Sequence, residues 1–278
     1  MKLLTASFAT LAVLASMSTA SATVVNSFDD SPIAAYQWYK SDMREGGTAS
    51  IESLSGKGGN LENNAPLPTG AAKLTTGLNN GDKAEVKISG NFGTVGDFIR
   101  NGTLSYDYFK SSSDANGSAT ASIKLEIDDG NTNSGDGYAV FVYEPYWNIV
   151  PTVSTQPPLD TWTNVDISGD SGTFWHTGIY GESNQAGGGN NGMTLEDWND
   201  YFGGDLLDAL ITGVSVGIGT YNQGVTTYFD DVKFGNGQLD LAYDFEVSVI
   251  PLPAALPLYG AGLALLGLLG WRKRKAQA

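Results

Sequence analysis

The stretch Ala121-Ser122-Ile123-Lys124-Leu125-Glu126-Ile127 decides the fold class, because apolar and polar residues alternate along it without a break. A period of two puts the apolar side chains on one face of a β-strand and the polar ones on the other. Strands of this kind are typical of antiparallel sheets that bury one face. The segment therefore predicts a half-buried strand of an antiparallel sheet.

The same alternation recurs at residues 84–89, 214–218 and 239–247, with turn-rich stretches between such segments. Trp162, close to Val165 and Ile167, is expected in the core. Thr194 suits the N-cap of one short helix over residues 195–202, which has acidic residues in its first turn and two glycines after its end. We expect a single β-sandwich domain over residues 23–249.

The composition excludes several classes of protein. The chain of 278 residues has no Cys and one His, which excludes a disulfide scaffold, a thiolate metal site and a multi-histidine metal site. Lys2 and the basic residues at 272–275 lie outside residues 23–249, which leaves 10 basic and 30 acidic side chains there and a formal charge of -20. Such a surface repels polyanions and attracts Ca²⁺, so we expect no nucleic-acid partner.

Residues 1–22 have the layout of a secretory signal peptide. Lys2 supplies a positive start, residues 3–15 are mostly apolar, and Ala20-Ser21-Ala22 fits the small-residue cleavage pattern. We expect export through the secretion translocon and cleavage by signal peptidase after Ala22. The alternative, a buried N-terminal helix, is disfavoured because the segment has no amphipathic period.

Residues 254–271 form an uncharged apolar run, and a basic cluster follows it directly: Arg272, Lys273, Arg274 and Lys275. A helix of this length covers about 27 Å, close to the ~30 Å hydrocarbon core of a bilayer. Basic residues beside a transmembrane helix hold that end in the cytoplasm. We therefore expect a transmembrane helix with a cytoplasmic C-terminus, rather than a core helix.

Together with this helix and basic tail, the motif Ile250-Pro251-Leu252-Pro253-Ala254 resembles the VPLPA variety of PEP-CTERM sorting signal. Ile250 stands where the family pattern begins with Val. The resemblance implies that an exosortase-type enzyme of a Gram-negative bacterium processes residues 250–278. The chain would be anchored transiently in the inner membrane and then released or attached to the cell surface.

Residues 194–235 resemble the closing segment of jelly-roll domains, including galactose-binding-like and carbohydrate-binding ones. A short helix leads to a Gly-punctuated strand, a loop and a last strand that contains Asp230-Asp231-Val232. The resemblance implies an all-β, antiparallel jelly-roll β-sandwich with one short helix. The signal peptide and the sorting signal with its transmembrane helix would flank this domain.

Four aspartates are candidate ligands for a structural calcium ion: Asp29, Asp30, Asp230 and Asp231. Jelly rolls of the kind that the chain resembles often hold such an ion where the first and last strands meet. Carboxylate oxygens suit this hard cation, and a lone buried carboxylate is costly unless it is paired. The alternative is that these carboxylates make structural hydrogen bonds.

Three aromatic residues in or beside expected loops are candidate ligand contacts: Tyr146, Trp147 and Trp175. Flat rings stack on sugar rings, while nearby polar groups bind the hydroxyls, as binding pockets combine apolar walls with a few polar groups. The alternative is that these rings belong to the core, because sandwich cores also use large aromatic residues. Exposure of at least one ring in a cleft would favour ligand binding.

Catalysis is the least favoured function. Glu126 and Asp128 begin a series of strand carboxylates like that of some jelly-roll glycosidases, but Gly130 and Asn131 stand where the third acid should be. Glu126 is expected on a solvent-exposed strand face, and the single histidine, His176, has no nucleophile motif near it. We expect a secreted, non-catalytic surface or matrix protein associated with exopolysaccharide. The alternative is a purely structural surface or biofilm protein.

Overall fold

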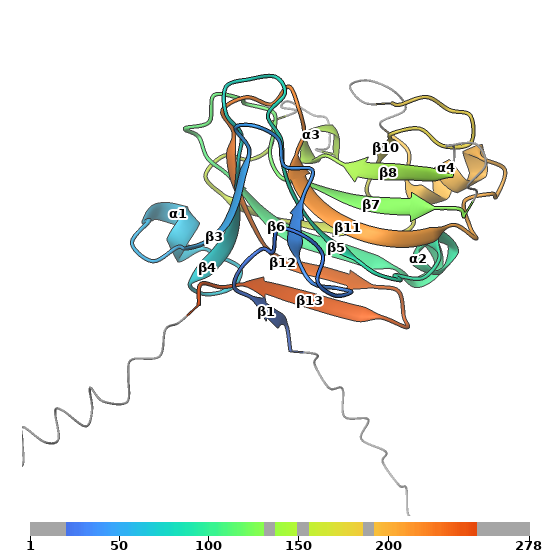
Figure 1. Ribbon diagram of the computed structural model, residues 1–278, viewed down its shortest axis with the longest axis horizontal. Coiled ribbons are helices and arrows are strands. Elements are labelled where there is room, and N and C mark those ends of the chain that lie inside the picture. Colours follow the sequence, from blue (N-terminus) through green and yellow to red (C-terminus); the bar gives the residue numbers. More distant parts are fainter. Residues whose placement is uncertain (1–20, 131–136, 149–155, 186–191, 249–278) are drawn as a thin grey trace, which may run out of the picture.

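The computed structural model of the chain describes residues 21–130, 137–148, 156–185 and 192–248. They form a β-sandwich of two sheets with a few short helices (Figure 1). The predicted β-sandwich is therefore confirmed. The sorting motif, the predicted transmembrane helix, the basic tail and nearly all of the signal peptide lie outside the described residues. Within the four described ranges, no helix is long and apolar enough to cross a membrane.

The first sheet, which we call sheet A, is antiparallel except where its edge strand β1 pairs with β13 in parallel. Strand β12 is central, with β6 on one side and first β4, then β13, on the other. The strands of sheet A are β1 (Thr23–Val25), β3 (Thr48–Ser53), β4 (Gly70–Thr75), β6 (Thr103–Lys110), β9 (Trp162–Ile167), β12 (Thr226–Gly235) and β13 (Asp240–Phe245).

The second sheet, sheet B, is antiparallel throughout its described strands, in the order β10-β8-β7-β11-β5-β2. Figure 1 shows it packed over sheet A, with α3 at the end of β8. The strands of sheet B are β2 (Tyr39–Ser41), β5 (Ala84–Ser89), β7 (Ser122–Asp128), β8 (Tyr138–Tyr143), β10 (Trp175–His176) and β11 (Leu210–Ile218).

The main core lies between the two sheets and follows the predicted alternation. Ile123, Leu125 and Ile127 of β7 point inward and are fully buried, as are Val214 and Val216 of β11. Their polar neighbours in sequence point to the opposite face of sheet B. Because the buried residues fix the orientation of each strand, these polar residues all lie on the outer face of sheet B. This outer face carries the candidate site.

The structure has four short helices among its described residues, where one was expected: α1 (Gly59–Asn63), α2 (Val95–Asn101), α3 (Pro145–Asn148) and α4 (Leu195–Tyr201). Helix α4 is the predicted one, and Thr194 and Asp197 form a capping box at its start. Thr94 and Asp97 form the same motif before α2, so the sequence carried a usable signal for this helix.

The prediction that Trp162 belongs to the main core is wrong. Val165 follows it by three positions, an odd offset, so the two side chains point to opposite faces of β9. Trp162 instead packs in a smaller cluster on the outer face of sheet A, 5.6 Å from the Phe109 ring. Its indole nitrogen donates a hydrogen bond of 3.0 Å to the carbonyl oxygen of Leu61.

Candidate functional site

Strand β11, one of the two central strands of sheet B, presents small residues to the outer face along its middle. These are Gly213, Ser215 and Gly217, which alternate with the buried valines of the same strand. Ser215 is flanked by Lys87 of β5 on one side and by Lys124 of β7 on the other. The two long side chains therefore rise on either side of a strip that has almost no side chains of its own.

Two ion pairs cross this strip. The Lys87 Nζ lies 2.8 Å from Oε1 of Glu126 on the far side of β11, and Lys124 reaches back across the strand to Glu85. A Cβ atom added at Gly213 would lie 2.8 Å from Oε2 of Glu126. The residues of the strip have to be small because the carboxylate side chains lie across them.

These charged side chains form a recessed floor rather than an open face. Lys124, Glu85 and Glu126 are between 5% and 8% exposed, so the expectation of a solvent-exposed Glu126 is wrong. Burial by itself would favour the neutral acid at Glu85, but the charges of Lys124 and Lys83 outweigh it and lower its pKa to about 2. Glu85 is therefore ionised at neutral pH.

A groove of about 410 Å³ lies over this floor. Tyr138 and Trp175 line it on the side of β8 and β10, and Arg44 and Lys83 line it on the opposite side. Arg44 and Lys83 both bind Asp42, at 2.9 and 2.5 Å. The groove thus has aromatic groups on one wall and paired charges on its floor and other wall.

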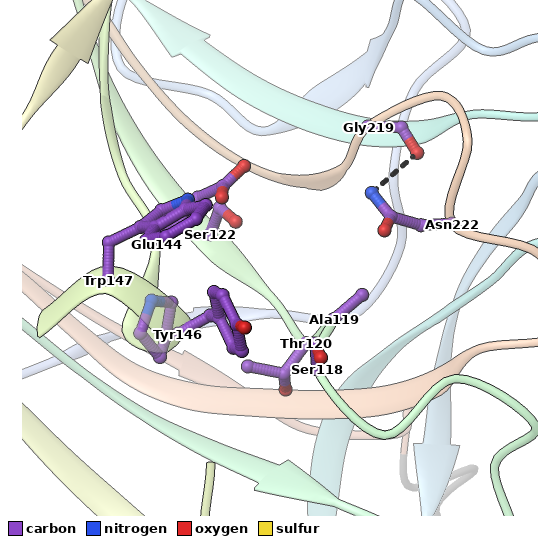
Figure 2. Close-up of a pocket in the computed structure, with 10 residues that line it drawn as sticks. Ser118, Ala119, Thr120, Ser122, Glu144, Tyr146, Trp147, Gly219 and Asn222 are labelled. Atoms are coloured by element: carbon purple, nitrogen blue, oxygen red, sulfur yellow. Dashed lines mark hydrogen bonds between the residues drawn. The ribbon is translucent and has the colours of Figure 1, made fainter. Parts of the chain in front are cut away.

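A second cavity of about 340 Å³ continues from one end of the groove. The two cavities share Ser122, Glu144 and Gly219 as lining residues. Figure 2 shows Tyr146 and Trp147 with Glu144 on one side of this cavity and Asn222 on the other. The two cavities are therefore neighbours with Glu144 in the wall of both, and together they are called the depression.

Helix α3 places the aromatic pair next to Glu144. The rings of Tyr146 and Trp147 meet edge to face, with centroids 4.7 Å apart, and Trp147 is 41% exposed. The side chain of Asn148 anchors the helix, because its Nδ2 donates to the carbonyl oxygen of Thr173 and its Oδ1 accepts from the Thr173 amide. The exposed ring is thus held on a fixed support.

The facing wall, residues 118–120, depends on a buried lysine. Lys110 is fully buried, and its Nζ donates hydrogen bonds of 2.6 Å to the carbonyl oxygens of Asn116 and Ala119. The side chain of Asn116 in turn accepts from the amides of Ser118 and Ala119. Because a buried ammonium group needs such partners, Lys110 fixes the shape of this wall.

Glu144 differs electrically from the other acids of the depression. Burial raises the pKa of Glu144, whereas the indoles of Trp147 and Trp175 and the charge of Lys124 act in the opposite direction. Glu85 and Glu126 are bound to lysines, but no ion pair to Glu144 is seen among the described residues. Burial therefore favours the protonated form of Glu144 more than it would be favoured at an exposed carboxyl group.

The three predicted aromatic contacts lie around this one depression. Tyr146 and Trp147 line the smaller cavity, Trp175 lines the groove, and none of the three belongs to the main core. Sequence reasoning missed the charged floor at Glu85, Lys87 and Lys124. The signal was present in the alternation of β5 and β7, but single strands do not show which of their polar residues will meet across a third strand.

Three of the four predicted calcium ligands lie in separate environments. Asp30 pairs with Lys40 at 2.8 Å, and Asp231 pairs with Lys233 at 2.6 Å. Asp230 is fully buried in sheet A. In the part of the chain that the structure describes, no three His, Asp or Glu side chains gather as a metal-binding group.

His176 lies in the core and not in the groove. It is fully buried, and its Nδ1 accepts a hydrogen bond of 3.1 Å from the amide of Gly178. Its ring meets those of Trp198 and Phe141 at centroid distances of 4.5 and 5.3 Å. Burial lowers the pKa of His176, so it is a neutral structural residue at neutral pH.

No family model matches the chain, and no curated protein matches it. Solved structures with some similarity include a family 11 carbohydrate-binding module from Clostridium thermocellum in complex with a beta-1,3-1,4-mixed-linked tetrasaccharide. It is 14% identical with a TM-score of 0.39, and the match covers 80% of this chain and 97% of the module.

Two further similar structures are a family 30 carbohydrate-binding module and the cellulose induced protein Cip1. The family 30 module is 11% identical with a TM-score of 0.37, covering 74% of this chain and 78% of the module. Cip1 is 15% identical with a TM-score of 0.37, covering 72% of this chain and 91% of Cip1. All three TM-scores are below 0.5.

Proposed function

We propose that the depression on sheet B binds a polysaccharide chain without cleaving it. The observation that carries the proposal is that Trp147, an exposed ring on an anchored helix, lines a depression that also presents hydrogen-bonding groups. Sugars combine apolar ring faces with hydroxyl groups, and such a surface offers partners for both.

Cleavage is disfavoured by the state of the carboxyl groups. Glycoside hydrolysis needs one acid to donate a proton and a second carboxylate, free to act as a nucleophile or base. Lysines hold both Glu85 and Glu126, and Glu144 alone does not complete the pair. We therefore propose that the protein binds polysaccharide and is not a glycosidase.

We further propose that the protein acts outside the cell. The signal peptide at residues 1–22 and the sorting signal at residues 250–278 support export, a transient membrane anchor and processing by an exosortase-type enzyme. The processed domain would associate with exopolysaccharide at the cell surface or in the matrix. Mass spectrometry of the exported protein tests this proposal, since an intact C-terminus at residue 278 would contradict processing.

A polysaccharide retention assay tests the binding proposal. The wild-type protein and the Trp147→Ala variant are passed separately over immobilised polysaccharides. We expect the wild type to be retained and the variant not to be retained. Absence of retention on every polysaccharide would contradict glycan binding and favour a purely structural surface role. Repeating the assay and a melting curve with EDTA tests for calcium, because a bound ion stabilises the folded state.

A further inference from the structure

The charges that line the groove balance one another, unlike those of the rest of the protein. They comprise four basic and four acidic side chains: Arg44, Lys83, Lys87 and Lys124, and Asp42, Glu85, Glu126 and Glu144. Residues 23–249 as a whole carry a formal charge of -20. The side chains that line the groove therefore have no net formal charge, although the protein as a whole is strongly acidic.

Each basic group of the groove is already bound to a carboxylate. Lys87 lies 2.8 Å from Glu126, Lys83 lies 3.0 Å from Glu85, and Lys124 also binds Glu85. An incoming carboxylate or sulfate would have to displace one of these acids or lie beside it. Like charges this close are strongly unfavourable in a recessed site, where water screens them poorly.

We propose that the groove selects uncharged polysaccharides over polymers that carry uronate or sulfate groups, a proposal that rests on the proposed glycan binding. Hydroxyl groups can donate to the paired carboxylates and accept from the paired ammonium groups without breaking either ion pair. Hydrogen bonds to ionised partners are stronger than those between neutral groups. The floor therefore serves a neutral polyol well and an anion poorly.

Glu126 is the specificity residue that tests this proposal most directly. Its carboxylate lies across β11 beside Gly213 and neutralises Lys87. In Glu126→Gln the shape of the side chain is kept, while the positive charge of Lys87 is left unbalanced in the groove. We expect the variant to gain affinity for acidic polysaccharides on the order of tenfold, a difference of about 1.4 kcal/mol.

The assay compares a neutral set of mixed-linkage β-glucan, xylan and agarose with an acidic set of polygalacturonate, alginate and dextran sulfate. The matched control is Glu52→Gln, which removes the same charge from sheet A. Glu52 binds Lys57 and Lys73 at 3.1 and 3.0 Å, away from the groove. We expect the wild type and this control to be retained only by the neutral set.

The outcomes separate the two proposals. Retention of the wild type by the acidic set as strongly as by the neutral set overturns the selectivity but leaves glycan binding in place. No retention by either set overturns both. Equal gains in Glu126→Gln and Glu52→Gln, or no gain in a folded Glu126→Gln, also overturn the selectivity.

A measurement on the wild type covers the case in which Glu126→Gln does not fold. Binding of a neutral polymer should change little between about 0.05 and 0.5 M NaCl, because no net charge is neutralised on binding. A steep loss of retention with salt would show that the groove recognises charge and would contradict the proposal.

Discussion

The backbone amide of Phe245 donates a hydrogen bond of 3.1 Å to Oδ1 of Asp230, a fully buried carboxyl group. Asp230 stands at the point along β12 where pairing with β4 ends at Phe229 and pairing with β13 begins at Val232. Asp231, next to it, has a positive φ of 50° and bulges the strand. The buried carboxyl group therefore joins the end of β13 to the centre of sheet A.

Asp230 should make the protein less stable as the pH rises. Burial, opposed by backbone hydrogen bonds, raises the pKa of Asp230 to about 8, so the folded state holds a proton that the unfolded state releases near pH 4. Stability from this group is present below pH 4 and is lost as the pH rises to 8. We expect Asp230→Asn, which resembles the protonated acid, to flatten this decline in melting curves between about pH 5 and 9.

The matched control for this prediction is Asp30→Asn. Asp30 is exposed, and its pKa is lowered by the hydrogen bond and charge of Lys40. This variant should keep the pH dependence of the wild type. An identical decline with pH in Asp230→Asn and the wild type would contradict the raised pKa.

His176 should act in the opposite direction, on the acid side. Burial lowers the pKa of His176 in the folded state below the value of about 6.5 that it has when unfolded. Stability from this group is full above that pH and falls as the pH decreases, because the unfolded state takes up the proton first. In denaturant titrations from about pH 7 to 5, His176→Phe should lose less stability than the wild type. A parallel loss in both proteins would contradict this role.

Trp147→Ala should weaken polysaccharide binding without destabilising the fold. The side chain is 41% exposed and lies outside the main core, so its removal costs little packing. A central aromatic contact is worth at least about tenfold in affinity. The control is Tyr201→Ala, which removes an exposed ring on a different helix, α4, and should bind polysaccharide normally. Equal binding by Trp147→Ala and the wild type would remove the aromatic contact from the proposal.

Lys110→Met should damage both stability and binding. The substitution keeps an apolar stem but removes the donor to the carbonyl oxygens of Asn116 and Ala119. Leaving these groups and the nearby Asp114 without their buried partner should lower the free energy of unfolding by about 3 kcal/mol. Because this lysine shapes one cavity wall, affinity should fall even well below the melting temperature. Lys57→Met, at an exposed position, is the control.

The outline of the domain could be predicted from local patterns. The strand predicted over residues 121–127 corresponds to β7 (Ser122–Asp128), and Thr194 caps α4, because a period of two and a capping box are complete within a few residues. The prediction for Trp162 was wrong because it relied on proximity to Val165 in the sequence. The alternation of side chains along β9 puts the two residues on opposite faces. The three aromatic candidates line two neighbouring cavities, and their contact with a ligand stays a prediction.

Local sequence patterns were enough to predict a two-faced, strongly acidic β-domain with its apolar residues facing inward, since alternation and composition are properties of single segments. The position of β11 between β5 and β7 could be seen only in the folded chain, and it is this order that lets Lys87 meet Glu126 and Lys124 meet Glu85. Strand order depends on which buried faces fit together over long separations in sequence. The same long-range packing lets Lys110 hold the wall opposite Trp147 and buries Asp230 beneath the end of β13.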